Sequence, residues 1–162
     1  MTGTMAQSTP KYDAPGNPPS DIVQNARGLM RDAVLEMMKD SRNVAGRDYI
    51  LVDLRRTDFE GGFIRGAINL PAQSLHATLP TLYTLFRESG LRKVIWYCSS
   101  SRGRGTRAAN WFNSYLADRG DELTESLILL EGIRGWATAG DEFVSWMEGY
   151  DPSFWAPEPE LK

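Results

Sequence analysis

Cysteine and histidine are scarce in this chain, and their scarcity excludes several classes of protein before any motif is considered. It has one cysteine, Cys98, and one histidine, His76. A single cysteine excludes a disulfide framework within the chain and any metal site that needs several thiolates. His76 lies far from Cys98 in the sequence, which argues against a cysteine–histidine dyad. We therefore expect no metal site and no bound cofactor.

An excess of charge of one sign and long apolar runs are also lacking. The 18 basic and 21 acidic residues give a net charge of -3, so we expect neither nucleic acid nor membrane as a partner. No apolar run approaches the roughly 18 residues of a membrane span. The first residues carry no apolar core of the kind that a signal peptide needs. We expect a cytoplasmic or nuclear protein, and the sequence leaves monomer and homodimer open.

The distribution of proline and polar residues predicts the domain organisation. A length of 162 residues with 41% hydrophobic residues suits one globular domain. Residues 1–20 are rich in proline, glycine and polar residues, which predicts a disordered tail. We expect the catalytic domain over residues 21–150. Residues 151–162 hold three prolines and form the expected C-terminal tail, which Phe154 and Trp155 would attach to the domain.

Continuous apolar runs alternate with helical spacings in the body of the chain. The runs end near Asp53, Cys98 and Gly132. Such runs predict strands buried on both faces of a parallel sheet, with helices on both of its faces, and hence an α/β fold. Sites in such sheets form at the carboxyl ends of the strands. The expected helices follow apolar spacings around residues 30–38, 79–86, 108–116 and 142–147, and the methionines of the first belong to the expected core.

The segment after Cys98 has the composition of an anion-binding loop. The residues of this loop are Ser99, Ser100, Ser101, Arg102, Gly103 and Arg104. Small residues let backbone N–H groups converge on one point, and the following helix N-terminus adds positive potential. That potential favours the thiolate, which is the nucleophilic form of cysteine. Arg104 would hold two oxygens of a bound oxyanion. The alternative is a structural cysteine, because free cysteine is often buried.

Two further motifs give the chain a resemblance to a known family. Residues 49–71 contain an apolar strand, then Asp53 and Arg55, then a Gly-x-Ile-x-Gly-Ala-x-Asn-Leu-Pro-like turn, and residues 130–136 read Leu-Glu-Gly-Ile-Arg-Gly-Trp. With the Cys98 loop, these motifs resemble the signatures of rhodanese-like domains. In the second motif the family usually carries two glycines, whereas this chain has only Gly132. The resemblance implies a rhodanese-like fold, with Asp53 and Arg55 supporting the loop.

Loop length points to a branch of that family. Five residues separate Cys98 from Arg104. This spacing is similar to that of the cell-division-cycle phosphatases and the eukaryotic arsenate reductases, whereas sulfurtransferase loops are usually one residue shorter. Those relatives commonly place histidine before the cysteine, where this chain has Tyr97. No acidic residue stands out in the sequence as the general acid that a phosphatase needs. The compact chain most resembles the fungal arsenate reductases.

The resemblance implies a thiol-dependent arsenate reductase in which Cys98 attacks the arsenic. With one cysteine in the chain, an external thiol must complete the reduction, and glutathione with a glutaredoxin fills this role in the related enzymes. Three alternatives remain open: a phosphatase, a thiosulfate sulfurtransferase, and a non-catalytic module that binds a phosphorylated partner. The role of Arg102, as a solvated charge or as a selector for anions, also remains open.

Overall fold

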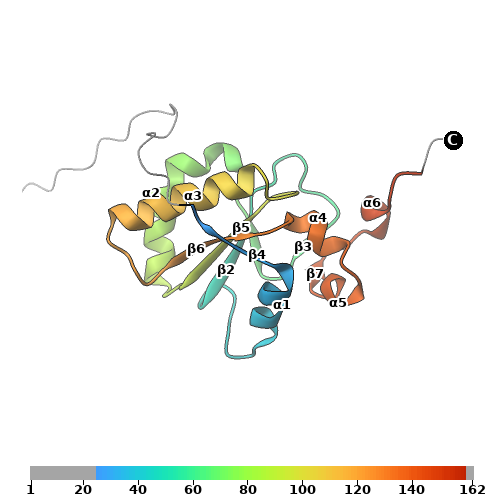
Figure 1. Ribbon diagram of the computed structural model, residues 1–162, viewed down its shortest axis with the longest axis horizontal. Helices are drawn as coiled ribbons and strands as arrows, with labels where there is room; N and C mark the ends of the chain where they lie inside the picture. The colour runs from blue at the N-terminus through green and yellow to red at the C-terminus, as the bar shows by residue number, and fades with distance from the viewer. Residues whose placement is uncertain (1–24, 160–162) are drawn as a thin grey trace, which may run out of the picture.

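A five-stranded parallel sheet forms the centre of the computed structural model, which describes residues 25–159. The strands lie in the order β1-β6-β5-β2-β4. They span Arg27–Leu29 (β1), Tyr49–Asp53 (β2), Ala67–Asn69 (β4), Lys93–Tyr97 (β5) and Glu125–Leu129 (β6). A separate antiparallel pair joins Phe63–Ile64 (β3) and Met147–Glu148 (β7). The sheet confirms the predicted α/β class (Figure 1).

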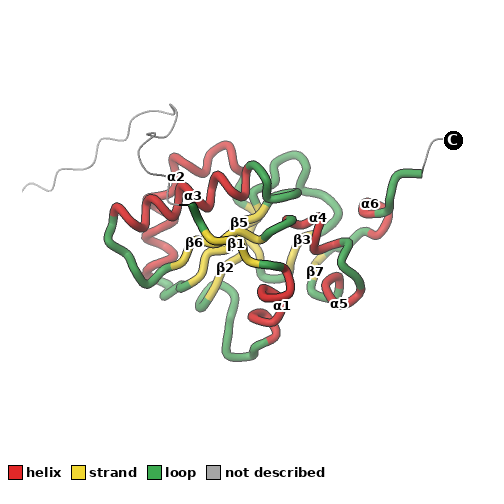
Figure 2. Tube along the Cα trace, viewed as in Figure 1, coloured by secondary structure: helices red, strands yellow, loops and turns green. Residues whose placement is uncertain are grey.

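Helices cover both faces of this sheet, as predicted (Figure 2). They span Arg31–Lys39 (α1), Ala72–Glu88 (α2), Arg104–Asp118 (α3), Gly132–Ala137 (α4), Asp141–Val144 (α5) and Pro152–Trp155 (α6). Alternation along each strand divides the core in two. One face packs on α2 and α3 around Trp96 and Phe112. The other packs on α1, α4 and α5 around Ile95 and Trp136.

The three apolar runs form the middle of the sheet because each is shielded on both sides. All five residues of β2 are buried, and β5 pairs with β2 on one edge and β6 on the other. Asp53 is aligned with Tyr97 in the register of β2 and β5. The carboxyl ends of these strands therefore lie side by side, and the loops after them share one edge of the sheet.

Two local predictions about the helices were wrong. The last helix of the domain, expected over residues 142–147, ends at Val144, and Met147 instead pairs with Ile64 in the β3–β7 ribbon. Both of these side chains are buried, so the strand pairing satisfies the backbone beside the core. Met30 was expected in the core, but it precedes α1 in an extended conformation and is 54% exposed.

The C-terminal segment returns to the body of the domain. Its one helical turn, α6, begins at Pro152. The carboxylate of the preceding residue, Asp151, accepts a hydrogen bond from the Ser153 N–H. The Trp155 indole donates a hydrogen bond of 2.8 Å to the carbonyl of Gly61, while Phe154 stacks edge-on against Trp155. The expected N-terminal tail, residues 1–20, lies outside the described residues. Within residues 25–159, no helix is long and apolar enough to cross a membrane.

Candidate active site

Cys98 lies directly after the central strand β5 and is 3% exposed. Its Sγ accepts a hydrogen bond of 3.4 Å from the backbone N–H of Gly105, in the first turn of α3. The preceding residue, Tyr97, points to the opposite face of the sheet, where it is fully buried and its hydroxyl lies 3.5 Å from the Ile64 nitrogen. Burial and the nearby Asp53 raise the pKa of Tyr97 well above its usual value. The residue before the cysteine is therefore a core residue in this chain.

The turn after β6 fixes the direction of the first peptide groups of the loop. The carbonyl oxygens of Cys98 and Ser99 accept hydrogen bonds of 3.0 Å from the N–H groups of Ile133 and Arg134 in α4. In a trans peptide, the N–H points opposite to the carbonyl. The N–H groups of Ser99 and Ser100 therefore point away from α4. Within residues 25–159, the N–H groups from Ser99 to Arg104 make no hydrogen bond to another protein group.

Gly132 allows this contact between the turn and the loop. It has a φ of 60°, and a Cβ atom there would lie 2.5 Å from the Cys98 carbonyl oxygen. The preceding position, where the family usually has its first glycine, holds Glu131 at a φ of 66°. This left-handed conformation is unfavourable for a side chain of that size. The Glu131 carboxylate is held by Arg31 at 2.7 Å.

Ser101 closes the loop over Cys98. It is buried and has a φ of 58°, the left-handed conformation that makes successive N–H groups converge. Its hydroxyl accepts a hydrogen bond of 3.3 Å from the Cys98 N–H. Its carbonyl oxygen accepts one of 2.6 Å from the Thr106 hydroxyl in α3. Gly103 then precedes α3, whose first turn contains no acidic residue, so the positive end of the helix faces the loop unopposed.

Arg104 is positioned by an acidic residue that the sequence did not single out. Its Nη1 and Nη2 atoms donate to the two oxygens of Asp58 at 2.8 and 2.6 Å. The pKa of Asp58 is lowered well below its usual value, mainly by this guanidinium. The pKa of Arg104 is raised, first by Asp58 and more weakly by the Cys98 thiol, with burial opposing. Arg104 is thus paired with Asp58, and the next residue, Gly105, donates its N–H to Cys98. Arg102 is exposed.

Asp53 and Arg55 form a buried ion pair beneath this site. Nη2 of Arg55 lies 2.8 Å from Asp53, and both side chains are shielded from solvent. The same guanidinium donates to the carbonyl oxygens of Glu60 and Gly62, each at 2.7 Å. The loop between β2 and β3 therefore wraps around Arg55. Because Asp58 belongs to this loop, the loop connects the buried Asp53–Arg55 pair to Arg104 through Asp58.

The sequence offered little sign of Asp58, because the motif places it in a turn among other polar residues. Its partner lies 46 positions away, and only the parallel register of β2 and β5 brings their following loops together. His76, in contrast, packs edge-on against the Trp111 ring of α3 with 4.8 Å between the ring centres.

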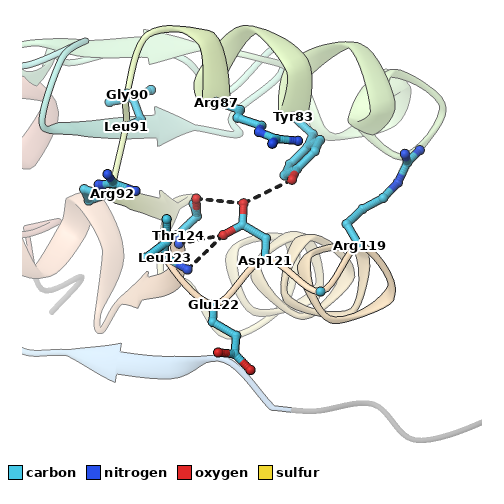
Figure 3. Close-up of a pocket in the computed structure, with 11 residues that line it drawn as sticks. Tyr83, Arg87, Gly90, Leu91, Arg92, Arg119, Asp121, Glu122, Leu123 and Thr124 are labelled. Carbon is cyan, nitrogen blue, oxygen red and sulfur yellow. Dashed lines mark hydrogen bonds between the residues drawn. The ribbon is translucent and has the colours of Figure 1, made fainter.

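The hollow shown in Figure 3 lies at the other end of the sheet from Cys98, before β5 and β6. It has a volume of about 330 Å³ and is lined mainly by polar residues. Asp121 lies at its centre and accepts hydrogen bonds from the Tyr83 and Thr124 hydroxyls and from the Leu123 and Thr124 N–H groups. These bonds connect α2, α3 and β6. We therefore interpret this hollow as a structural feature that holds the elements together, and not as a binding site.

A cysteine at the end of a central parallel strand, a loop of open N–H groups and an arginine at the start of the next helix together define a cysteine-centred oxyanion site on an α/β domain. The chain belongs to the rhodanese-like domain family, whose model matches residues 30–139. This match confirms the family and the fold that the sequence predicted.

The individual relatives have two kinds of name, arsenic-related and phosphatase. The chain is 34% identical to arsenical-resistance protein 2 of Saccharomyces cerevisiae, with 57% of this chain and 76% of that protein covered. Its fold is similar to yeast Ygr203w, described as a protein tyrosine phosphatase of the rhodanese family, with 24% identity, a TM-score of 0.69, and coverage of 83% of this chain and 100% of that one. It is also similar to the As-Sb reductase from Leishmania major, with 24% identity, a TM-score of 0.58, and coverage of 67% and 74%. At 24% identity, the last two similarities show the shared fold.

Proposed function

We propose that this protein is a thiol-dependent arsenate reductase in which the Cys98 thiolate is the nucleophile. The observation that carries the proposal is the placement of the single cysteine at the base of a loop whose N–H groups are open to an anion. Arg104 lies at the same loop, and the similarity to a yeast arsenical-resistance protein supports arsenate as the anion.

The first step forms a bond between Cys98 Sγ and arsenic. The thiol and dihydrogen arsenate give a thiol–arsenate adduct and one water molecule, which carries away one arsenate oxygen. The open N–H groups of Ser99 to Arg104 and the Arg104 guanidinium stabilise the negative charge on the remaining oxygens. The Gly105 N–H, which already points at Sγ, stabilises the thiolate before the attack.

The second step needs a thiol from outside the chain, because Cys98 is the only cysteine. An external thiol such as glutathione attacks Sγ, and the S–As bond breaks with its electron pair moving to arsenic. Arsenic is reduced from the +5 to the +3 state, arsenite leaves, and the two thiols become a mixed disulfide. A glutaredoxin thiol then reduces this disulfide and restores Cys98.

Asp58 argues against the phosphatase alternative. Phosphomonoester hydrolysis needs a protonated group to donate to the leaving alkoxide. Asp58 is the acidic side chain held at Arg104, and that ion pair keeps its pKa well below the usual range, so it stays ionised near neutral pH. In arsenate reduction, the leaving oxygen can take its proton from the substrate itself.

The test is arsenite formation by the purified protein with arsenate, glutathione and glutaredoxin. Cys98→Ser should abolish turnover, and Arg104→Ala should lower kcat/KM by about 100-fold or more. Arg119→Ala, at the far end of the sheet, is the matched arginine control and should keep wild-type activity. Arsenite formed without added thiol beyond one equivalent per chain would contradict the mechanism.

Parallel assays separate the alternatives. Hydrolysis of p-nitrophenyl phosphate without arsenite formation would assign the protein to the phosphatases. A stable gain of one sulfur on Cys98 after thiosulfate treatment would assign it to the sulfurtransferases. A Cys98→Ser variant that keeps its full cellular function would indicate a binding module.

A further inference from the structure

Asp58 is held in place by its own loop as well as by Arg104. Its Oδ1 accepts a hydrogen bond of 2.9 Å from the Arg56 N–H, two residues earlier in the chain. The loop itself is fixed from inside by Arg55, whose guanidinium also lies 4.8 Å from the centre of the Phe59 ring. The Asp58 carboxylate is therefore a fixed point from which Arg104 is oriented.

The carboxylate keeps an unused acceptor position. Oδ1 receives two hydrogen bonds, from Arg104 Nη1 and from the Arg56 N–H, whereas Oδ2 receives one, from Arg104 Nη2. A carboxylate oxygen can accept about two. Asp58 is 43% exposed, so Oδ2 is open to a ligand. Arg104 directly precedes Gly105, whose N–H donates to Cys98 Sγ, so an oxyanion bound to Arg104 above the sulfur lies beside this carboxylate.

A carboxylate in this place distinguishes between oxyanions by their protons. Its charge repels any anion, and the repulsion is offset only when the anion donates a hydrogen bond to it. Arsenate and phosphate each carry at least one proton near neutral pH and can donate. Sulfate and thiosulfate carry none. The exposed cations Arg102 and Arg107 attract all four anions alike and give no such distinction.

We propose that Asp58 is a positioning and specificity-determining residue: it orients Arg104 and accepts a hydrogen bond from a hydroxyl of the bound oxyanion. The site therefore selects protonated oxyanions of the arsenate and phosphate class over sulfate and thiosulfate. This inference rests on the proposed oxyanion site at Cys98, and it explains how a rhodanese-like domain could reject the sulfur donor of the sulfurtransferases.

Protection of Cys98 from alkylation tests the inference without requiring turnover. Because the chain has one cysteine, the rate of iodoacetamide modification reports on Cys98 alone. The rate is measured at neutral pH against increasing phosphate or sulfate, at constant ionic strength, and gives a dissociation constant for each anion. In the wild-type protein, phosphate should protect at about tenfold or more lower concentration than sulfate.

Asp58→Asn should reduce this preference by about tenfold, since the amide repels no anion and can donate to sulfate. Asp58→Glu keeps the charge on a longer side chain, so it should weaken the binding of both anions while keeping the preference for phosphate. Asp40→Asn is the matched control, because Asp40 forms a similar exposed bidentate pair with Arg42. It should behave as wild type.

The outcomes separate this inference from the proposed function. Equal protection by phosphate and sulfate in the wild-type protein, or an unchanged ratio in Asp58→Asn, overturns the role of Asp58 and leaves the oxyanion site standing. Failure of both anions to protect Cys98, together with no arsenite formation, overturns the proposed function as well. Asp58→Asn is compared only after its far-ultraviolet circular dichroism matches that of wild type. If it does not fold, the ratio of the sulfate and phosphate dissociation constants is measured in Asp58→Glu instead. Loss of the phosphate preference in that variant overturns the inference.

Discussion

At the scale of single residues, Arg55 connects the buried sheet to the loop that carries Asp58. Its guanidinium has three kinds of partner: the Asp53 carboxylate, the Glu60 and Gly62 carbonyl oxygens, and the face of the Phe59 ring. The Arg55 side chain is 1% exposed and Asp53 is fully buried, so water cannot replace the contact between them. Removing this residue should therefore lower the stability of the fold first, and disturb the site as a consequence.

Arg55→Met should lower the free energy of unfolding by about 3–5 kcal/mol, because it leaves the Asp53 charge buried without a partner. Urea denaturation followed by tryptophan fluorescence measures the change. Arg47→Met is the control: Arg47 forms a similar pair with Asp48 but on the surface, and its removal should cost about 0–1 kcal/mol. A loss in Arg55→Met no larger than in Arg47→Met would show that the buried pair adds nothing to stability.

At the scale of the elements, the Cys98 loop depends on two helices that approach it from opposite sides. The helix α3 begins at Arg104 and directs its N-terminus at the sulfur. The helix α4 holds the carbonyl oxygens of Cys98 and Ser99, so the N–H groups of the same peptides turn away from it. The contact with α4 requires the glycine at position 132, because a Cβ there would collide with the loop backbone.

Gly132→Ala should therefore damage both stability and the site. Gly120 has a similar φ, 65° against 60°, but no atom within 4 Å of a Cβ placed there. Gly120→Ala should cost only the conformational penalty of about 1–2 kcal/mol, whereas the collision in Gly132→Ala should add about 1–3 kcal/mol. Phosphate protection of Cys98 should weaken in Gly132→Ala alone. Equal unfolding free energies and equal protection in the two variants would argue against the α4 contact as a determinant of loop shape.

At the scale of the whole molecule, sequence patterns predicted the three central strands of the sheet, and they failed where a feature depends on a distant partner. The apolar runs predicted β2, β5 and β6 because those strands are buried on both faces. The strands β3 and β7 have two residues each and exist because they pair with each other across more than 80 positions. Asp58 was missed for the same reason: a short acidic turn carries no sign of an arginine in another loop. Loop length, in contrast, is a local property, so Cys98 and Arg104 could be proposed together from the sequence.

The two ends of the sheet have different roles in the molecule. The carboxyl end carries the open N–H groups and Cys98, whereas the amino end is closed by the Asp121 carboxylate and by Glu125, which pairs with Arg27 and Lys93. Burial raises the pKa of Asp121, but the hydrogen bonds from Thr124, Leu123 and Tyr83 outweigh it, and the pKa is lowered overall from 3.8. A carboxyl whose pKa is lower in the folded protein contributes stability above its unfolded value, and this contribution is lost as the pH falls through the folded value.

We therefore expect the unfolding free energy of the wild-type protein to fall as the pH is lowered below about 4. Asp121→Asn, which cannot ionise, should be less stable than wild type near neutral pH, and the two curves should converge in acid. Glu122→Gln is the control at the same hollow: Glu122 lines it but is exposed, so this substitution should change the unfolding free energy little near neutral pH. Urea midpoints measured from about pH 7 down to about pH 2.5 give all three curves. An Asp121→Asn curve that stays parallel to wild type throughout would mean that this carboxylate does not hold the amino end of the sheet together, and that the acid sensitivity of the domain arises from its other ion pairs.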